Sequence, residues 1–127
     1  MFAAMSSSRL ALGAARASIG LGAWLAPDLT VRVFGMDPER SDRFVGRLFG
    51  SREFALAAAL LAAPPGAVAP VAAIGAAVDG FDAIAGFGEA RRGNLSTRAT
   101  ILGPIGAVFF AALGVHVARS AARTPTV

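Results

Sequence analysis

Several ionisable residues lie inside long apolar stretches of this chain, where an isolated charge is costly. A charge at the centre of a bilayer costs about 2.5–3.5 kcal/mol on insertion scales, so such residues usually face the interior of a helix bundle and pair with one another. We therefore predict a buried ion-pair network, and its members are Arg16, Arg52, Glu53, Asp79 and Asp82.

Glycines and carboxylates recur at helical spacing in two of these stretches. One series, at steps i, i+4, i+7 and i+11, consists of Gly75, Asp79, Asp82 and Gly86. The other series contains a Gly-x-x-x-Gly motif and consists of Gly46, Gly50, Glu53 and Ala57. Each series lies on one helix face, and small residues let helix backbones approach closely. The pattern predicts that these two faces meet across glycine-lined surfaces.

The three carboxylates could support chemistry as well as structure. Asp79 and Asp82 lie one helical turn apart, so they could share a proton or bind a cation, and with Glu53 they could form a proton relay or a small acid/base site. In the simpler interpretation, Arg16 and Arg52 neutralise them as structural ion pairs. We favour that interpretation and keep Glu53, Asp79 and Asp82 as candidate catalytic residues.

Three arginines lie on one face near the start of the second apolar stretch, namely Arg40, Arg43 and Arg47. They could hold anionic lipid headgroups, with each arginine contributing about 1 kcal/mol near an anionic surface. Alternatively, they snorkel toward the membrane surface and only set the depth of the helix. Trp24 and His116, each near the end of an apolar stretch, are typical of the membrane interface.

The elements that position these residues are apolar stretches of the length that a bilayer demands, about 17–25 residues. Hydrophobic residues make up 55% of the 127 residues and charged residues 16%, and the mean hydropathy is +0.62. Soluble domains contain about 25% charged residues. We therefore predict one all-α domain over residues 1–127, an integral membrane bundle of four transmembrane helices at about 10–26, 38–63, 67–88 and 99–118.

Capping residues and prolines set these bounds. The cluster at 6–8 can cap the first helix, Asp37-Pro38-Glu39 is expected to start the second, and the cluster at 94–97 to start the fourth. Pro27 and Pro64 close the first and second helices. The segment between Pro27 and Asp37 is amphipathic, so it forms either a short interfacial helix or an ordinary loop.

Composition excludes several classes of function. The chain has no cysteine, which removes disulfides, thiol redox catalysis and Cys-ligated metals. The arginines are dispersed among apolar runs, which argues against a nucleic-acid interface despite the net charge of +4. His116 is the only histidine, and no phosphate-binding loop is present. We expect no metal and no cofactor.

The distribution of arginines indicates an orientation. The loops after the first and third helices are rich in arginine, whereas the second loop has none; these arginines are Arg32, Arg40, Arg43, Arg91, Arg92 and Arg98. The positive-inside rule then places both Arg-rich loops in the cytoplasm. All twelve basic residues are arginine, a bias associated with GC-rich bacterial genomes, so we expect a multi-pass protein of the bacterial inner membrane.

The motif Leu48-Phe49-Gly50-Ser51-Arg52-Glu53, followed by an Ala/Leu run, resembles small bacterial membrane proteins of the domain of unknown function family 4267. The similarity also includes an early Gly-x-x-Arg helix that closes in Ala-Pro, and extends more distantly to DoxX-like four-span proteins. It implies a four-span fold, with Arg52 and an acid in the second span and a third-span partner at Asp79 or Asp82. Glu53 stands where that family usually has Asp, and the resemblance implies no activity.

Three classes of function remain open. We favour a non-enzymatic interaction or accessory subunit, whose partners would be membrane lipids and either a second copy or a larger membrane complex. The second class is a small transporter, or an ion- or proton-coupled protein, that uses Glu53, Asp79 and Asp82. The third is a membrane-embedded acid/base enzyme acting on a lipid or terpenoid.

Overall fold

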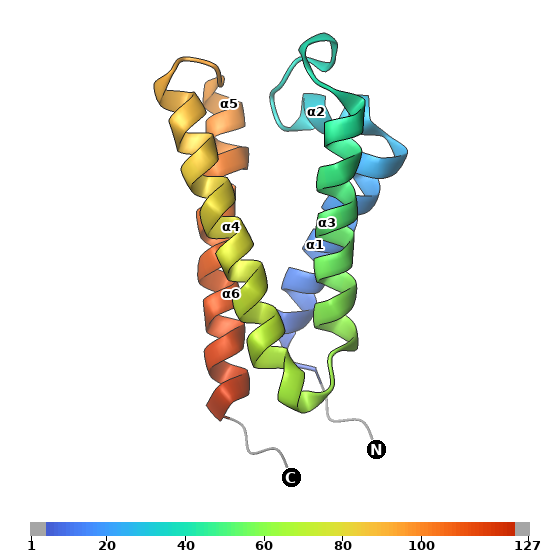
Figure 1. Cartoon of the computed structure of the whole chain (residues 1–127), viewed down its shortest axis with the longest axis vertical. Coiled ribbons are helices and arrows are strands. Elements are labelled where there is room, and N and C mark those ends of the chain that lie inside the picture. Colours follow the sequence, from blue (N-terminus) through green and yellow to red (C-terminus); the bar gives the residue numbers. More distant parts are fainter. Residues whose placement is uncertain (1–4, 124–127) are drawn as a thin grey trace.

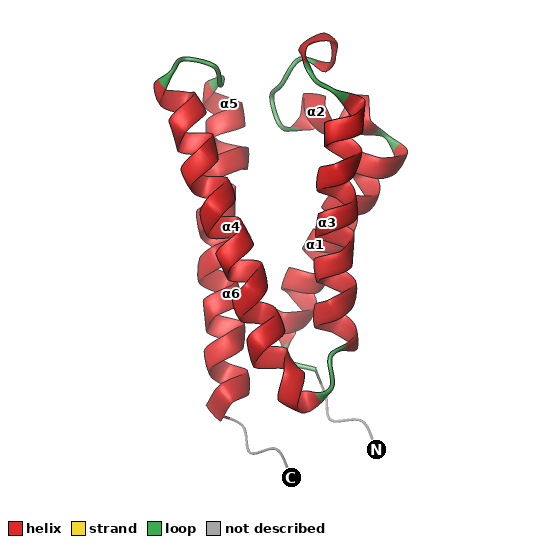
Figure 2. Cartoon of the chain, viewed as in Figure 1, coloured by secondary structure: helices red, strands yellow, loops and turns green. Residues whose placement is uncertain are grey.

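The structure, a computed structural model, describes residues 5–123, and every regular element in that range is helical. The all-α prediction is confirmed (Figure 2). The elements in chain order are α1 (Ser7–Leu25), α2 (Pro27–Val33), η1 (Pro38–Arg40), α3 (Arg43–Ala62), η2 (Pro65–Ala67), α4 (Val68–Arg91), α5 (Thr97–Thr100), η3 (Ile101–Ile105) and α6 (Gly106–Arg123).

The long helices form two antiparallel pairs (Figure 1). α1 packs along α3 and makes the first hairpin, and α4 packs along α6 and makes the second hairpin. Fewer contacts join the hairpins, mainly α1 with α6 and α3 with α4. The hairpins come together near the two termini and diverge toward the end that carries α2 and α5.

Local capping explains where the helices begin. Ser6 accepts a hydrogen bond from the backbone N–H of Arg9 and caps α1 as expected, and Ser96 caps α5 in the same way. The predicted start of the second helix at Asp37-Pro38 is wrong, because these residues form only the 3₁₀ turn η1. The backbone is extended at Asp42, whose carboxylate accepts from the N–H groups of the following turn, so α3 begins at Arg43.

Two other predicted bounds shift for identifiable reasons. α4 continues past Gly88 to Arg91 and ends where Gly93 adopts the left-handed conformation, with φ of 78°, that glycine takes without strain. The fourth predicted helix holds a π-helical turn, η3, that contains Pro104. Since proline lacks an N–H and crowds the preceding turn, a wider turn accommodates it. The segment after Pro27 forms α2, a short helix and not a loop.

The first hairpin depends on two glycines that bring helix backbones into direct contact. A Cβ at Gly20 would lie 2.7 Å from the backbone nitrogen of Phe54, and a Cβ at Gly50 would lie 2.7 Å from the carbonyl oxygen of Gly20. Within the Gly-x-x-x-Gly motif of α3, Gly50 therefore meets α1. The predicted contact with the third helix is wrong for Gly50, because α1 occupies that surface, whereas Glu53 on the same face lies close to Asp79 and Asp82 of α4.

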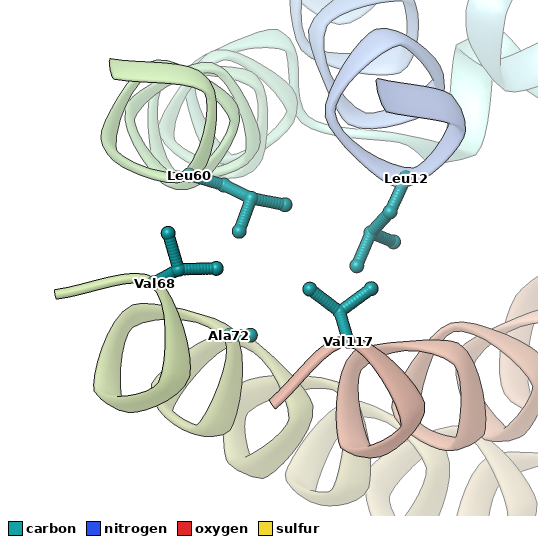
Figure 3. Packing of buried hydrophobic residues seen from close by; sticks show 5 residues of the cluster. All are labelled: Leu12, Leu60, Val68, Ala72 and Val117. Carbon is teal, nitrogen blue, oxygen red and sulfur yellow. The ribbon is translucent and has the colours of Figure 1, made fainter. Parts of the chain in front are cut away.

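An apolar cluster joins both hairpins near the terminal end of the bundle. Leu12 from α1, Leu60 from α3, Val117 from α6, and Val68 and Ala72 from α4 point toward a common centre (Figure 3). Each is at most 5% exposed. Burying side chains of this size stabilises the fold by about 1.5–3 kcal/mol for each valine or leucine, so this cluster holds the closed end of the two hairpins.

Two helical segments in the described range are long and apolar enough to cross a membrane. They are Pro65–Arg91, with a mean hydropathy of 1.5, and Thr97–Arg123, with a mean hydropathy of 2.0. α1 and α3 do not reach this standard, since α1 contains Arg9 and Arg16 and α3 contains several charged residues. Apolar composition alone therefore supports a membrane crossing for two helices, and a four-span bundle is not supported by it.

The two glycines of the Gly-x-x-x-Gly motif should respond oppositely to substitution. Gly50→Ala should lower the thermal stability in detergent, because forcing a methyl group into a packed backbone contact costs about 1–3 kcal/mol. Gly46→Ala is the matched control, since no atom lies within 4 Å of its added Cβ, and it should hold or raise stability through better helix propensity. Circular dichroism melts measure both, and equal melting temperatures would contradict the contact.

Candidate functional site

Arg16 lies at the centre of the bundle and is in contact with all four long helices. Its Nη1 donates to Oε2 of Glu53 on α3 at 2.8 Å and to Oδ1 of Asp79 on α4 at 3.1 Å, and its Nη2 donates to Oδ2 of Asp79. The guanidinium carbon lies 5.5 Å from the ring centre of Phe110 on α6. Arg16, Glu53 and Asp79 are each no more than 3% exposed, so this charged cluster is part of the core.

Gly75 makes room for the Arg16 guanidinium. A Cβ at this position of α4 would lie 3.1 Å from Nη2 of Arg16. Because the glycine precedes Asp79 by one helical turn, the planar guanidinium can lie along the backbone of α4 and present two nitrogens to one carboxylate. The glycine and the aspartate therefore form one binding surface for the arginine.

A second ion pair adjoins the first and is partly open. Nη2 of Arg52 donates to Oδ2 of Asp82 at 2.5 Å and to Oε1 of Glu53 at 3.4 Å, so Glu53 connects the two arginines. The Arg52 and Asp82 side chains are 39% and 33% exposed. Arg52 also lies over the ring of Phe49, at 5.2 Å, while its buried Nε has no hydrogen-bond partner.

The network is not charge-balanced. Three carboxylates and two guanidinium groups leave one formal negative charge among the interacting groups. Oxygens of Glu53, Asp79 and Asp82 lie within 4.8 Å of one another, a spacing that could hold a metal ion, whereas we expected no metal from the sequence. Arg16 and Arg52 already supply positive charge to all three acids, so a single proton or monovalent cation would complete the balance.

The structure brings together all five residues of the expected network, but not in the expected arrangement. We expected the second and third helices to face each other. In the structure the buried centre is Arg16 on α1, and only Arg52 of α3 reaches across to Asp82 of α4. Gly86 packs against Pro104 of η3 instead of against α3. The small-residue face of α3 meets α1 at Gly50, and the series on α4 is divided among Arg16 of α1, Arg52 of α3 and Pro104 of η3.

Sequence reasoning missed the arginines that bind backbone carbonyls at helix ends. Arg9 donates to the carbonyls of Leu60, Leu61 and Ala63, where α3 ends. Arg47 donates to Trp24 O at 3.2 Å near the end of α1, and Arg98 to Val33 O at 2.8 Å at the end of α2. The last carbonyls of a helix lack partners within it. The available signal was that α1 and α3 are followed by Ala-Pro and not by a glycine, whereas α2 is followed by Gly35 and gave no such signal.

The three arginines assigned to lipid headgroups do not act as one set. Arg43 pairs with Asp28 through Nε at 3.0 Å and Nη2 at 2.8 Å, and these hydrogen bonds hold the pKa of the Asp28 carboxyl below its usual range. Arg43 and Arg47 line a shallow cavity of about 440 Å³ together with Arg32. Arg40, on the 3₁₀ turn, is exposed and does not line this cavity.

The two residues that we expected at the membrane interface, Trp24 and His116, differ in their surroundings. Trp24 is about half exposed, yet its Nε1 donates to Ser51 Oγ at 2.6 Å and its ring carries the Arg47 guanidinium at 5.5 Å. His116 is exposed on α6. Neither residue joins the charged network, so the candidate site consists of the two arginines and three carboxylates.

Removing Arg16 should destabilise the protein far more than removing an exposed arginine. Arg16→Met leaves Glu53 and Asp79 buried without their partner, and breaking a buried pair costs about 3–5 kcal/mol. Arg43→Met, which breaks an exposed pair, is the matched control and should shift the melting temperature little. A triple variant, Arg16→Met with Glu53→Gln and Asp79→Asn, should recover part of the loss. Thermal melts in detergent measure all three, and equal losses for the two single variants would refute the central role.

Comparison with known proteins gives no further identification. No protein-family model, no curated protein and no solved structure matches the chain. The resemblance to the domain of unknown function family 4267 and to DoxX-like proteins therefore stays a prediction. The function is inferred from the geometry of the network and from the surface of the bundle.

Proposed function

We propose that this chain is a four-span membrane protein that acts as a non-enzymatic accessory or interaction subunit. The observation that carries the proposal is the buried Arg16, which binds Glu53 of the first hairpin and Asp79 of the second. Such a bridge fixes the position of the two hairpins relative to each other. The protein would therefore serve as a rigid helical unit against which other membrane components pack.

Burial of their charges supports placing α1 and α3 in the membrane beside α4 and α6. At mid-helix, Arg16 and Glu53 face the bundle interior, and the partly exposed Arg52 is paired with Asp82. The charges near the ends, Arg9, Arg43 and Arg47, lie where headgroups would be. α1 and α3 have 19 and 20 residues, or about 28–30 Å at 1.5 Å per residue, which matches the hydrocarbon thickness. Outward-facing apolar residues are abundant on all four helices, including Leu21, Phe54, Phe81 and Phe109.

An interaction role is supported by the pairing of the three acids with arginine and by the apolar surface of the second hairpin. An acid/base catalyst needs a free carboxylate that substrate can reach, whereas Glu53 and Asp79 are buried and bound to arginine and the partly exposed Asp82 is paired with Arg52. A shallow apolar cavity of about 600 Å³ on α4 and α6 is lined mostly by alanine and valine. Small residues of this kind are typical of helix contacts within membranes.

A second candidate function is coupling to a proton or a monovalent cation. The unbalanced negative charge of the network and the partial exposure of the Arg52–Asp82 pair favour it. In this alternative the charge that completes the balance enters beside Asp82 while the Arg16 cluster stays intact. If the network is purely structural, no proton or cation enters it beside Asp82.

Single cysteines will test the four-span topology, because the chain has none of its own. Glu39→Cys and Asn94→Cys lie in the two Arg-rich loops, and Gly66→Cys lies at the opposite end with no atom within 4 Å of its Cβ. In intact bacterial cells, an impermeant thiol reagent should label Gly66→Cys and should reach the other two only after permeabilisation. If only α4 and α6 cross, Glu39→Cys will instead behave like Gly66→Cys.

Proton flux in reconstituted vesicles separates the two candidate functions. Under an applied membrane potential, vesicles with the wild-type chain should acidify no faster than empty vesicles, because each acid of the network is held in an ion pair with arginine. A pH-sensitive dye inside the vesicles measures the rate, with a known protonophore as positive control. Flux that appears with the wild-type chain and disappears in Asp82→Asn would overturn the structural proposal in favour of coupling.

A further inference from the structure

A basic corner forms where the end of α1, the short α2 and the start of α3 meet. The cavity of about 440 Å³ at this corner is lined by Ala26, Pro27, Asp28, Leu29, Arg32, Arg43 and Arg47. Three guanidinium groups stand against one carboxylate, so two formal positive charges are not compensated by the lining residues. Because Asp28 keeps its charge through its bond with Arg43, the corner attracts an anion and not a cation.

Two of the three guanidinium groups that could bind this anion are already oriented. Arg47 is fixed through Nε by Trp24 O, and its two terminal nitrogens make no hydrogen bond within residues 5–123. Arg43 uses Nε and Nη2 for Asp28, which leaves Nη1. The Arg32 side chain likewise makes no hydrogen bond in the described chain and can turn toward the cavity. Guanidinium groups bind phosphate oxygens in a planar, two-pronged geometry, and orienting them beforehand lowers the entropic cost of binding.

Exposed apolar residues belong to the same segments that form the basic corner. Leu25 at the end of α1 is 78% exposed, Leu29 on α2 is 59% exposed, and the half-exposed Trp24 ring lies under Arg47. Tryptophan is typical of the level where headgroups meet hydrocarbon. A soluble phosphate would use only the arginines and would leave these apolar side chains in water.

We propose that this corner binds the phosphate of an anionic lipid, with Arg32, Arg43 and Arg47 around the phosphate and the acyl chains along Leu25 and Leu29. The inference rests on the proposed membrane embedding. It replaces Arg40 of the sequence-based set with Arg32, because Arg40 lies on the 3₁₀ turn outside the cavity. Asp28 positions Arg43, and the two uncompensated positive charges of the arginines favour lipids with a net negative charge.

Arg32→Gln and Arg40→Gln form a matched pair, because both arginines are exposed, lie near the same end of the bundle and make no side-chain hydrogen bond in the described chain. The full-length protein in detergent would be titrated with phosphatidylglycerol or with phosphatidylcholine, and bound lipid counted by native mass spectrometry. Arg32→Gln should weaken phosphatidylglycerol binding about fivefold, whereas Arg40→Gln should leave it unchanged. Phosphatidylcholine should bind all variants weakly and equally.

Three outcomes would overturn the inference or its basis. Equal phosphatidylglycerol binding by both variants, with unchanged melting temperatures, would refute the headgroup site while leaving the membrane proposal intact. Displacement of phosphatidylglycerol by equimolar inorganic phosphate would show that the corner binds soluble phosphate instead. A chain that is released from membranes by alkaline carbonate would refute membrane embedding itself, which is a separate result from the binding titration.

Discussion

The contact of Arg16 with Glu53 and Asp79 is the interaction on which the rest of the structure depends. Within each hairpin, helices meet through glycine and alanine, and such contacts set distance without fixing which hairpin lies beside which. The Arg16 guanidinium fixes the arrangement of the hairpins, since it forms hydrogen bonds with one acid on α3 and another on α4. Buried charge of this kind is costly to leave unpaired, so alternative packings of the hairpins are penalised.

The same chemistry recurs at the ends of the helices in a milder form. Arg9, Arg47 and Arg98 each donate to carbonyls that the end of a helix leaves without partners. Where water is scarce, an unsatisfied carbonyl costs several kcal/mol, and a guanidinium can satisfy two carbonyls while its charge faces the surface. The many arginines of this chain therefore have distinct structural tasks, which a count of basic residues in loops does not distinguish.

Much of the fold follows from local sequence, and the arrangement of the site does not. Hydropathy and capping residues located the helices, and the cost of buried charge selected the five residues that meet. Pairing between distant helices was harder to predict from the sequence. Gly46 and Gly50 share a face and a motif, yet only Gly50 lies against another backbone. Which helix a small-residue face meets depends on competition among all helices, and in this chain α1 takes the face that periodicity assigned to the third helix. Arg32 lines the basic corner because the segment after Pro27 forms the helix α2. The sequence alone left open whether this segment is a short helix or a loop.

The division of charge between the hairpins has a consequence for how the protein is made. Within the network, the first hairpin carries Arg16, Arg52 and Glu53 and has one excess positive charge, while the second carries Asp79 and Asp82 and has two negative charges. In the proposed membrane arrangement, the first hairpin leaves the ribosome first and carries a network charge that its own residues cannot neutralise. Only the arrival of the second hairpin removes it, so in the proposed arrangement a truncated chain stays distinguishable from a finished one by the charge it exposes to lipid.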